Sequence, residues 1–379
     1  MKTHISVSSS PVTVLQLIAP THFGGAERVV LGLAESLNRD QFRVVVGAFV
    51  NVHFRQNEFV ERMEKAAIRH EVFWLKRTID MENVFRLVGF IKREGIHLIH
   101  SHGYRSDIIG LAAAKISGIP AVSTVHGWVP IDSRLRFYEK CDRVALRFFD
   151  HVMPVTDQIV GTLAASGIDP ARMTRMHNAI SVNGETSSTR ADFRVRSSES
   201  GNITIAVIGR LSPEKDVPTF LRAAGHVAEK LHGVRFLVVG DGPERTKLEQ
   251  MAKEMELGDK VRFTGFVEDM GSIYRSLDLL VISSLTEGIP LVVLEAMQQG
   301  IPVVSTRVGG IPEVIEDGVN GILVEPGDPH ALSRAIVSLV LDDNKYVEIS
   351  RNGRDRIARS FNRSVWTQEM EKIYHDVLR

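Results

Sequence analysis

The chain has 379 residues, with 46 basic and 46 acidic side chains, a hydrophobic fraction of 44% and a single cysteine, Cys141. This balance is typical of a globular protein of two or more domains, gives no indication of nucleic-acid binding, and excludes an intrachain disulfide, which fits a reducing cytoplasm. No apolar run reaches the ~18 residues of a membrane span, and the polar, serine-rich start is unlike a signal peptide.

Short apolar runs alternate with amphipathic stretches along the whole chain. In the first half we expect strands at 12–19, 42–49, 97–101, 121–125 and 151–155. In the second half we expect them at 203–208, 235–239, 261–263, 278–283, 302–305 and 321–325. Strands buried on both faces are apolar throughout, and the stretches between them have helical periodicity, as at 26–38, 80–94, 216–230 and 328–341. The alternation predicts an α/β fold with two Rossmann-like domains and parallel sheets.

Polar residues follow several of the expected strands in the first half. Gly24 and Gly25 open a helix, and a loop without side chains can approach a ligand closely, although an ordinary flexible loop has the same composition. His126 ends a strand, where it could contact a sugar hydroxyl, transfer a proton, or serve only in packing. His100 and His102 also end a strand, but no third ligand is evident, which argues against a metal site.

The stretch 133–149 has the pattern of a basic amphipathic helix. Arg136, Lys140, Arg143 and Arg147 recur at helical spacing on one face, and aromatic and small residues occupy the other. Such a helix could contact a bilayer surface as a peripheral membrane element. A surface helix packed on the sheet would show the same pattern.

A change of composition divides the chain. Residues 181–202 are rich in serine, threonine and charge, and we interpret them as a linker between an N-terminal domain, 1–180, and a C-terminal domain, 203–360. A final helix is expected at 361–378. The first 180 residues hold 22 basic against 17 acidic side chains, so this half is the one expected to meet an anionic partner.

In the second half, Arg210 and Lys215 lie in the segment GRLSPEK, directly after the expected strand 203–208. A guanidinium fork and an ammonium beside a helix start can neutralise a pyrophosphate. They would also stabilise the charge that develops when a bond to the pyrophosphate breaks. Two ordinary surface cations in a loop are the alternative.

The segment VGDGPER resembles the start of a dinucleotide fingerprint, but Arg245 stands where the third glycine belongs. We therefore interpret Gly240 as part of a tight turn that lines a ligand cleft. Phe266 and Val267 follow another strand, where their backbone could pass along a nucleobase. An NAD-type oxidoreductase is the least favoured function, because no intact fingerprint is present.

The segment EGIPLVVLE is the strongest single motif. Glu287 precedes a helix start at the C-terminal end of a strand, where α/β folds bind ligands. The free N–H groups of a helix N-terminus favour a diphosphate, and Glu295 could accept hydrogen bonds from both hydroxyls of a ribose. An acidic helix start with one solvated glutamate is the alternative. The residues of the expected phosphate-binding turn are Gly288, Ile289, Pro290 and Leu291, with the proline suited to the first helical turn.

These motifs together resemble a known family. The run from Glu287 to Asp328, EGIPLVVLEAMQQGIPVVSTRVGGIPEVIEDGVNGILVEPGD, is similar to the hallmark of the retaining GT-B glycosyltransferases of family GT4, and Glu287 and Glu295 match its E-x7-E pair. GRLSPEKD matches the phosphate-gripping loop, GGAER the Gly-rich N-terminal loop, and His126 the cleft histidine. The resemblance covers nearly the whole chain and is weakest in 181–202.

For the second domain, the resemblance implies that Arg210 and Lys215 hold the diphosphate of a nucleotide-sugar donor. It implies that Glu295 binds the ribose and that Glu287 meets hydroxyls of the transferred sugar. Gly240, Phe266, Val267 and the turn that begins at Gly288 would complete the donor site.

For the first domain, the resemblance implies acceptor binding, contact of His126 with the donor sugar, and closure of the loop at Gly24 and Gly25 over the phosphates. The C-terminal helix would pack back on this domain, and the active site would lie in the cleft between the two domains. The implied reaction moves a sugar, with UDP as the expected nucleotide, to a hydroxyl of a glycan or lipid-linked acceptor with retention of configuration. It serves polysaccharide or glycoconjugate biosynthesis, at the cytoplasm or its membrane surface. No metal or cofactor is expected, and no D-x-D triplet occurs in the sequence.

Two positions depart from the family pattern. Asn178-Ala179-Ile180-Ser181 stands where N-G-[IV]-D is frequent, and Gly127 follows His126 where an acidic residue is common. The first departure bears on the hinge and the second on acceptor or sugar contacts. A sugar-nucleotide epimerase and a non-catalytic sugar-nucleotide-binding scaffold are the alternative functions on the same fold.

Overall fold

The computed structural model describes residues 11–20, 23–53, 56–77, 80–128, 133–181 and 203–379. The chain divides into two compact units, which we call unit 1 (Met1–Asn178 with Arg363–Arg379) and unit 2 (Ala179–Asn362). The stretch expected to be a linker, 181–202, lies outside the described residues except for Ser181.

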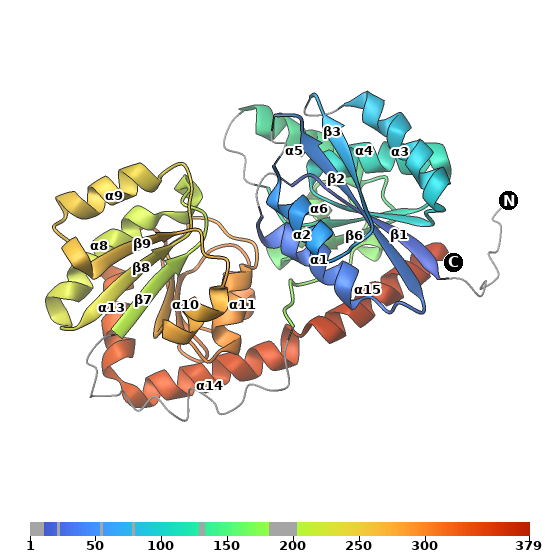
Figure 1. Cartoon of the computed structure of the whole chain (residues 1–379). Coiled ribbons are helices and arrows are strands. Elements are labelled where there is room, and N and C mark those ends of the chain that lie inside the picture. Colours follow the sequence, from blue (N-terminus) through green and yellow to red (C-terminus); the bar gives the residue numbers. More distant parts are fainter. Residues whose placement is uncertain (1–10, 21–22, 54–55, 78–79, 129–132, 182–202) are drawn as a thin grey trace. The chain divides into compact units, whose positions relative to one another are not determined.

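Unit 1 is built on a six-stranded parallel sheet in the order β3-β2-β1-β4-β5-β6 (Figure 1). Its strands are β1 (Val12–Ile18), β2 (Phe42–Asn51), β3 (His70–Leu75), β4 (Leu98–His102), β5 (Ala121–Val125) and β6 (His151–Pro154). Its helices are α1 (Gly25–Ser36), α2 (Glu58–Lys65), α3 (Met81–Glu94), α4 (Tyr104–Ser117), α5 (Ser133–Leu146), α6 (Asp157–Ala165) and α15 (Arg363–Leu378). The strand order reverses between β1 and β4, which is the position where such sheets bind ligands.

Unit 2 repeats this plan, with a parallel sheet in the order β12-β11-β10-β7-β8-β9. Its strands are β7 (Ile203–Ile208), β8 (Val234–Val239), β9 (Val261–Gly265), β10 (Leu279–Ile282), β11 (Val303–Thr306) and β12 (Ile322–Val324). Its helices are α8 (Val217–Lys230), α9 (Arg245–Glu254), α10 (Met270–Ser276), α11 (Leu291–Gln298), α12 (Ile311–Val314), α13 (Pro329–Leu341) and α14 (Asp343–Ser360). Here the order reverses between β10 and β7.

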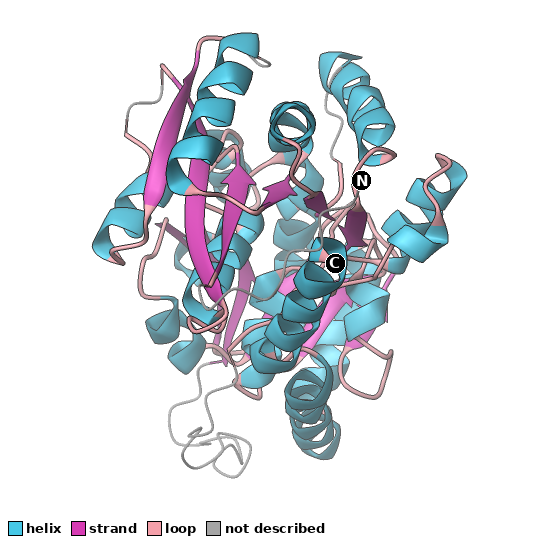
Figure 2. Cartoon of the chain, turned by 90° about the vertical axis from the view of Figure 1, so that its right-hand side faces the viewer, coloured by secondary structure: helices cyan, strands magenta, loops and turns pink. Residues whose placement is uncertain are grey.

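Helices cover both faces of each sheet, as Figure 2 shows with strands in magenta and helices in cyan. Successive strand residues point to opposite faces. Val45 therefore joins the core under α3 and α4, and Val46 joins the core under α1 and α2. In unit 2, Ile205 and Ala206 divide in the same way between two cores. This double burial, worth about 1.5–3 kcal/mol for each large apolar side chain, is why the strands are apolar throughout.

The α/β class and the two parallel sheets are confirmed, with two corrections to the expected elements. The sequence analysis missed β3, an edge strand in which only Phe73 and Leu75 are buried, so that it lacks a continuous apolar run. The helix expected at 133–149 ends at Leu146, and it buries only Asp142 and Leu146. Across the described residues, none of the helices combines the length and apolarity needed to cross a membrane.

The chain passes between the units at two neighbouring points. The backbone N–H of Ile180 donates to the carbonyl of Phe361 at 3.0 Å, so these two segments run side by side. After the second passage, α15 packs on unit 1 next to α1 (Figure 1). Tyr374 on α15 is fully buried there, and the backbone N–H of Asn38 donates to the carboxylate of Glu371 at 2.7 Å.

Candidate functional site

A cation and a carboxylate meet where β7 and β10 end in unit 2. Lys215, in the turn before α8, places its ammonium Nζ 2.7 and 2.9 Å from the two carboxylate oxygens of Glu287. The Glu287 side chain is 8% exposed and that of Lys215 is 26% exposed, so the pair is largely shielded from water. The hydroxyl of Ser284 donates to the same carboxylate at 2.7 Å. The geometry fixes both charged groups in one orientation at the ligand-binding edge of the sheet.

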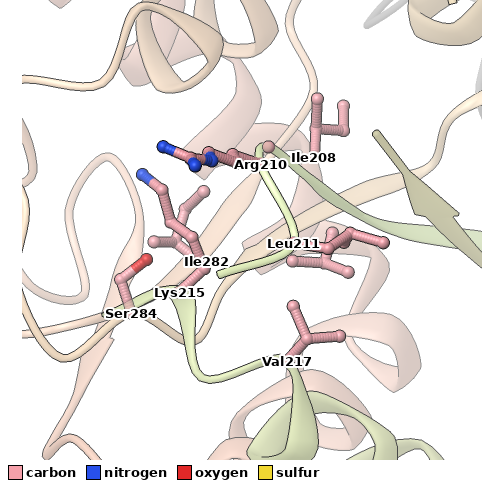
Figure 3. A pocket seen from close by; sticks show the side chains of 9 residues that line it. Ile208, Arg210, Leu211, Lys215, Val217, Ile282 and Ser284 are labelled. Atoms are coloured by element: carbon pink, nitrogen blue, oxygen red, sulfur yellow. The ribbon is translucent and has the colours of Figure 1, made fainter. Parts of the chain in front are cut away.

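Arg210 stands beside this pair. It is exposed, in the loop after β7, and lines a small cavity with Lys215 and Ser284. Figure 3 shows the Arg210 guanidinium and the Lys215 ammonium extending to the same side of the loop. The cavity holds only about 10 Å³, room for about one water. A larger anion would therefore contact these cations from the open side.

The turn after Glu287 leads into α11, and no side chain caps its N-terminus within the described part of the chain. Pro290 has an extended backbone and precedes the helix, which begins at Leu291, so it does not occupy the expected first helical turn. Ile289 and Leu291 are buried in the core of unit 2. Only backbone groups of this turn are thus placed to meet a ligand, as a helix N-terminus does for anions.

Glu295 lies in the fifth position of α11 and is half-buried. The hydroxyl of Tyr274, on α10, donates to its Oε2 at 2.7 Å. This hydrogen bond orients the carboxylate. A second helix thereby holds the residue that the sequence predicts to bind a ribose.

Glycines bring the loops of unit 2 into close contact. At Gly240, which has a φ of 128°, an added Cβ would lie 1.9 Å from the carbonyl oxygen of Gly209. Gly240 thus supports the loop that carries Arg210, and its direct contact with a donor stays a prediction. Phe266 is 57% exposed, whereas Val267 packs against the core.

In unit 1, Gly24 and Gly25 form the start of α1. The backbone N–H of Gly24 donates to the side chain of Glu27 at 3.1 Å, so this glutamate satisfies a backbone donor at the helix start. Burial raises the pKa of Glu27 to about 7. Gly25 is exposed, and no atom lies within 4 Å of an added Cβ. Folding of unit 1 therefore leaves room for a side chain at this position.

His126 ends a chain of buried hydrogen bonds in unit 1. Its Nε2 lies 3.2 Å from Nδ1 of His102, and Nε2 of His102 lies 2.9 Å from Oε1 of Gln16. The Gln16 amide nitrogen donates to the hydroxyl of Tyr374 at 2.9 Å, and that hydroxyl lies 2.6 Å from Nδ1 of His100. The C-terminal helix α15 is thereby linked to the strand end that carries His126.

These contacts define the proton positions. The Gln16 side-chain oxygen can only accept a hydrogen bond, so His102 must carry its proton on Nε2, the atom that faces this oxygen. The Nδ1 atom of His102 is then an acceptor, and the facing Nε2 of His126 donates to it. The proton of neutral His126 is therefore on Nε2, and its Nδ1 is an acceptor. Burial lowers the pKa of His126 to about 4 and that of His100 to about 3, and it holds the pKa of His102 well below its usual range. All three imidazoles are therefore neutral near pH 7.

Comparison with known protein families identifies the family to which this chain belongs. The model of a glycosyl transferase 4-like domain matches residues 24–179, and that of the glycosyl transferases group 1 matches residues 188–356. A relative from Arabidopsis thaliana, one of the subunits of phosphatidylinositol N-acetylglucosaminyltransferase, is 30% identical over 83% of this chain and 71% of its own length. The chain is a group 1 glycosyltransferase of family GT4.

Other similar proteins agree with this glycosyltransferase family. The Escherichia coli UDP-Gal:alpha-D-GlcNAc-diphosphoundecaprenol alpha-1,3-galactosyltransferase is 24% identical over 99% of this chain and 98% of its own length. The crystal structure of Anabaena HepE in complex with UDP has a TM-score of 0.81, at 23% identity, and covers 96% of this chain and 100% of that one. Sucrose-phosphate synthase from Thermosynechococcus elongatus has a TM-score of 0.79 at 21% identity, over 97% and 99% of the two chains. These likenesses confirm the GT-B fold.

The structure of this glycosyltransferase adds supporting residues that the sequence analysis missed. Ser284 hydrogen-bonds Glu287, and Tyr274 hydrogen-bonds Glu295. At Gly309 an added Cβ would lie 1.7 Å from the carbonyl oxygen of Glu287, and φ is 52°. A serine at a strand end and a double glycine after β11 were signals present in the sequence. Nothing local to Tyr274 points to its partner.

One departure from the family pattern has a structural explanation. Gly127 has a φ of 105°, a backbone conformation that disfavours the acidic side chain common at this position. In the other segment the departures are Ala179 and Ser181, for which the structure offers no explanation, whereas Ile180 fits the pattern. Ile180 is buried in the core of unit 2 and pairs with the chain at Asn362. The apolar residue thus anchors the start of unit 2.

Proposed function

We propose that the enzyme transfers a sugar from a nucleoside-diphosphate sugar, with UDP as the nucleotide, to a hydroxyl of a glycan or lipid-linked acceptor, with retention and without a metal. The observation that carries the proposal is the placement of Arg210 and the pair Lys215–Glu287 beside the uncapped start of α11. Cations and backbone N–H groups at one strand-end cluster suit a diphosphate.

The chemistry follows from where charge develops. Cleavage of the bond between the anomeric carbon and the diphosphate leaves negative charge on the departing phosphate oxygen. Arg210 and Lys215 would stabilise that charge, as would the N–H groups at the start of α11. Glu287 holds the Lys215 ammonium in place through two short contacts, and it would accept hydrogen bonds from hydroxyls of the transferred sugar. Metal independence is consistent with a site in which protein cations supply the positive charge.

Glu295 would bind the ribose of the nucleotide, with Tyr274 holding its carboxylate. Contact of Phe266 and Val267 with the base, and of His126 and Gly25 with the donor, stays predicted from the resemblance. For His126, the neutral ring with Nδ1 as acceptor suits a hydrogen bond from a sugar hydroxyl.

For the acceptor, two relatives have names that include lipid-linked substrates, a diphosphoundecaprenol and a phosphatidylinositol. On α5 of this chain Arg136, Phe137, Lys140 and Val144 are all exposed. Arg143, which the sequence places on the same cationic face, is instead half-buried and pairs with a glutamate on its own helix. The remaining mixed cationic and apolar face supports peripheral contact with an anionic bilayer at its cytoplasmic surface.

A flotation assay tests the membrane proposal. The protein should float with vesicles containing anionic phosphatidylglycerol and remain in the soluble fraction with phosphatidylcholine alone. Replacing Arg136 and Lys140 with glutamate should abolish flotation, whereas charge reversal at Lys230, on unit 2, should not. Absence of flotation at low salt would remove membrane contact from the proposal.

Turnover with sugar nucleotides tests the reaction itself. UDP-, GDP- and ADP-sugars are incubated with glycan and lipid-linked acceptors, and products are identified by mass. Proton NMR coupling at the new anomeric centre gives the stereochemistry, and EDTA tests the metal. A product of acceptor plus sugar supports transfer. An isomerised sugar nucleotide without acceptor would indicate an epimerase, and binding without turnover a scaffold.

A further inference from the structure

One face of the sheet in unit 1 buries a layer of polar side chains. Gln16 on β1, His100 and His102 on β4, and Thr124 on β5 are each at most 3% exposed. The strand register pairs Gln16 with His100 and His102 with Thr124, so these four side chains share one face. Leu17, the neighbour of Gln16, belongs to the apolar core on the opposite face. Burial of polar groups costs free energy that an apolar layer would not, so stability alone does not account for these residues.

The hydrogen bonds of this layer form one continuous chain of side chains. Six residues from β1, β4, α15 and the end of β5 take part, in the order His126, His102, Gln16, Tyr374, His100 and Thr124. The longest contact is 3.2 Å, between His126 and His102, and the last, from Nε2 of His100 to Oγ1 of Thr124, is 2.8 Å. The chain therefore connects the C-terminal helix to the strand end at which the resemblance places a ligand-contacting histidine.

All of these hydrogen bonds point in one direction. The Gln16 amide donates to the Tyr374 hydroxyl, so the proton of that hydroxyl is directed at Nδ1 of His100, and His100 donates from Nε2 to Thr124. Burial raises the pKa of Tyr374 above its usual range, so the hydroxyl keeps its proton. Half a turn of the Gln16 amide would reverse every bond and move the His126 proton to Nδ1. Because bonds in a chain polarise one another, reversal requires all of them to change together.

We propose that Tyr374, Gln16 and His102 are positioning residues of the active site. Through this chain they hold the proton of His126 on Nε2, so that Nδ1 is presented as an acceptor for a hydroxyl of the transferred sugar. The role of the sugar rests on the proposed glycosyl transfer, whereas the control of the proton position does not. Removing the Tyr374 hydroxyl cuts the chain, and the segment from Gln16 to His126 can then reverse by itself.

Nitrogen NMR of the full-length enzyme, labelled with 15N-histidine, tests the proton position without any ligand. Protonated and unprotonated imidazole nitrogens differ widely in 15N shift, and His126→Gln assigns the signals among the 14 histidines. In the wild type at pH 7.5, Nε2 of His126 should be protonated and Nδ1 unprotonated. In Tyr374→Phe both tautomers should be populated, so the two shifts should move toward each other. Gln16→Met, which is close in volume and removes both amide contacts, provides a second variant with the same expected result.

A matched control separates this effect from the loss of any buried hydroxyl. Tyr346 in unit 2 donates to the carbonyl of Asp278 at 2.7 Å, and Tyr346→Phe should leave the His126 shifts unchanged. In turnover assays, kcat/KM for the sugar nucleotide should fall in Tyr374→Phe by the fraction of His126 that leaves the wild-type tautomer. Inhibition by the free nucleotide, which has no sugar to meet Nδ1, should stay at the wild-type level.

Three results would overturn the proposal: a protonated Nδ1 of His126 in the wild type, unchanged His126 shifts in folded Tyr374→Phe and Gln16→Met, or an equal change in Tyr346→Phe. The positioning proposal and the proposed function fail separately. If the His126 shifts move as expected but no sugar nucleotide supports turnover, the transfer reaction is wrong and the control of the proton stands. If transfer occurs and kcat/KM for the donor is unchanged although the shifts move, the positioning role is wrong.

Discussion

Replacing Asp142 with asparagine should stabilise the protein at alkaline pH. Asp142 and Asp107 are both buried, Asp142 adds to the rise in the pKa of Asp107, and each carboxyl accepts a hydrogen bond from a neighbouring donor. An asparagine at position 142 carries no charge, and its amide oxygen can still accept from the indole N–H of Trp128. Asp142→Asn thus keeps this hydrogen bond and removes the cost of ionising a buried carboxyl.

The expected size follows from the carboxyl pKa. Burial raises the pKa of Asp142 from 3.8 to about 6. The folded state therefore binds this proton more tightly than the unfolded state, and stability falls as pH rises from about 4 to about 6. At ~1.4 kcal/mol per pK unit, the full loss is about 3 kcal/mol. The pKa of Asp107 is raised as well, by burial first and by Asp142 second, so its contribution has the same sign.

Urea unfolding at pH 4.5 and pH 8 measures the effect. Asp142→Asn should unfold with a free energy near that of the wild type at pH 4.5 and up to about 3 kcal/mol higher at pH 8. Asp40→Asn, at an exposed position, controls for loss of a charge. An equal difference at both pH values, or a variant less stable at pH 8, would refute the raised pKa of Asp142.

Three further predictions concern activity. Lys215→Ala should lower kcat by about 100-fold, as loss of one transition-state donor does, with little change in Tm. An unchanged kcat would remove Lys215 from the mechanism. Gly25→Ala should fold normally, because space is open at this position, and it should lose activity if the loop approaches the donor. Gly309→Ala should lose both stability and activity, because the added Cβ would clash with the carbonyl oxygen of Glu287. Full activity of Gly25→Ala would exclude close approach. Because burial lowers the pKa of His126 to about 4, the pH profile of kcat should show no inflection from this residue between pH 5.5 and 8. An inflection near pH 6.5 that disappears in His126→Gln would contradict the neutral state of this imidazole.

Much of the fold could be predicted because burial on both faces makes the strands apolar throughout. Leu279–Ile282 and Ile203–Ile208 were recognisable for this reason, whereas the edge strand His70–Leu75 was not, since one face is only half-buried. The placement of Lys215 and Glu287 at neighbouring strand ends also follows from topology, because parallel strands end at one edge.

The partners of the site residues could not be predicted in the same way. The contact between Tyr274 and Glu295 depends on how two helices pack, and no spacing in the sequence encodes it. The proximity of Asp107 on α4 and Asp142 on α5, which raises the pKa of Asp107, likewise depends on how two helices pack. Each residue alone has the composition of a solvated helix face.

The most direct test of the central claim is a thermal-shift titration with UDP, GDP, ADP and CMP on the wild type and on Glu295→Ala, with Glu268→Ala as a matched surface control. A nucleotide at 100 times its Kd should add about 2.7 kcal/mol of stability. The account predicts that UDP stabilises the wild type and the control, and that Glu295→Ala loses most of the shift. An equal shift in Glu295→Ala, or no shift with any nucleotide, would contradict a donor site at these residues.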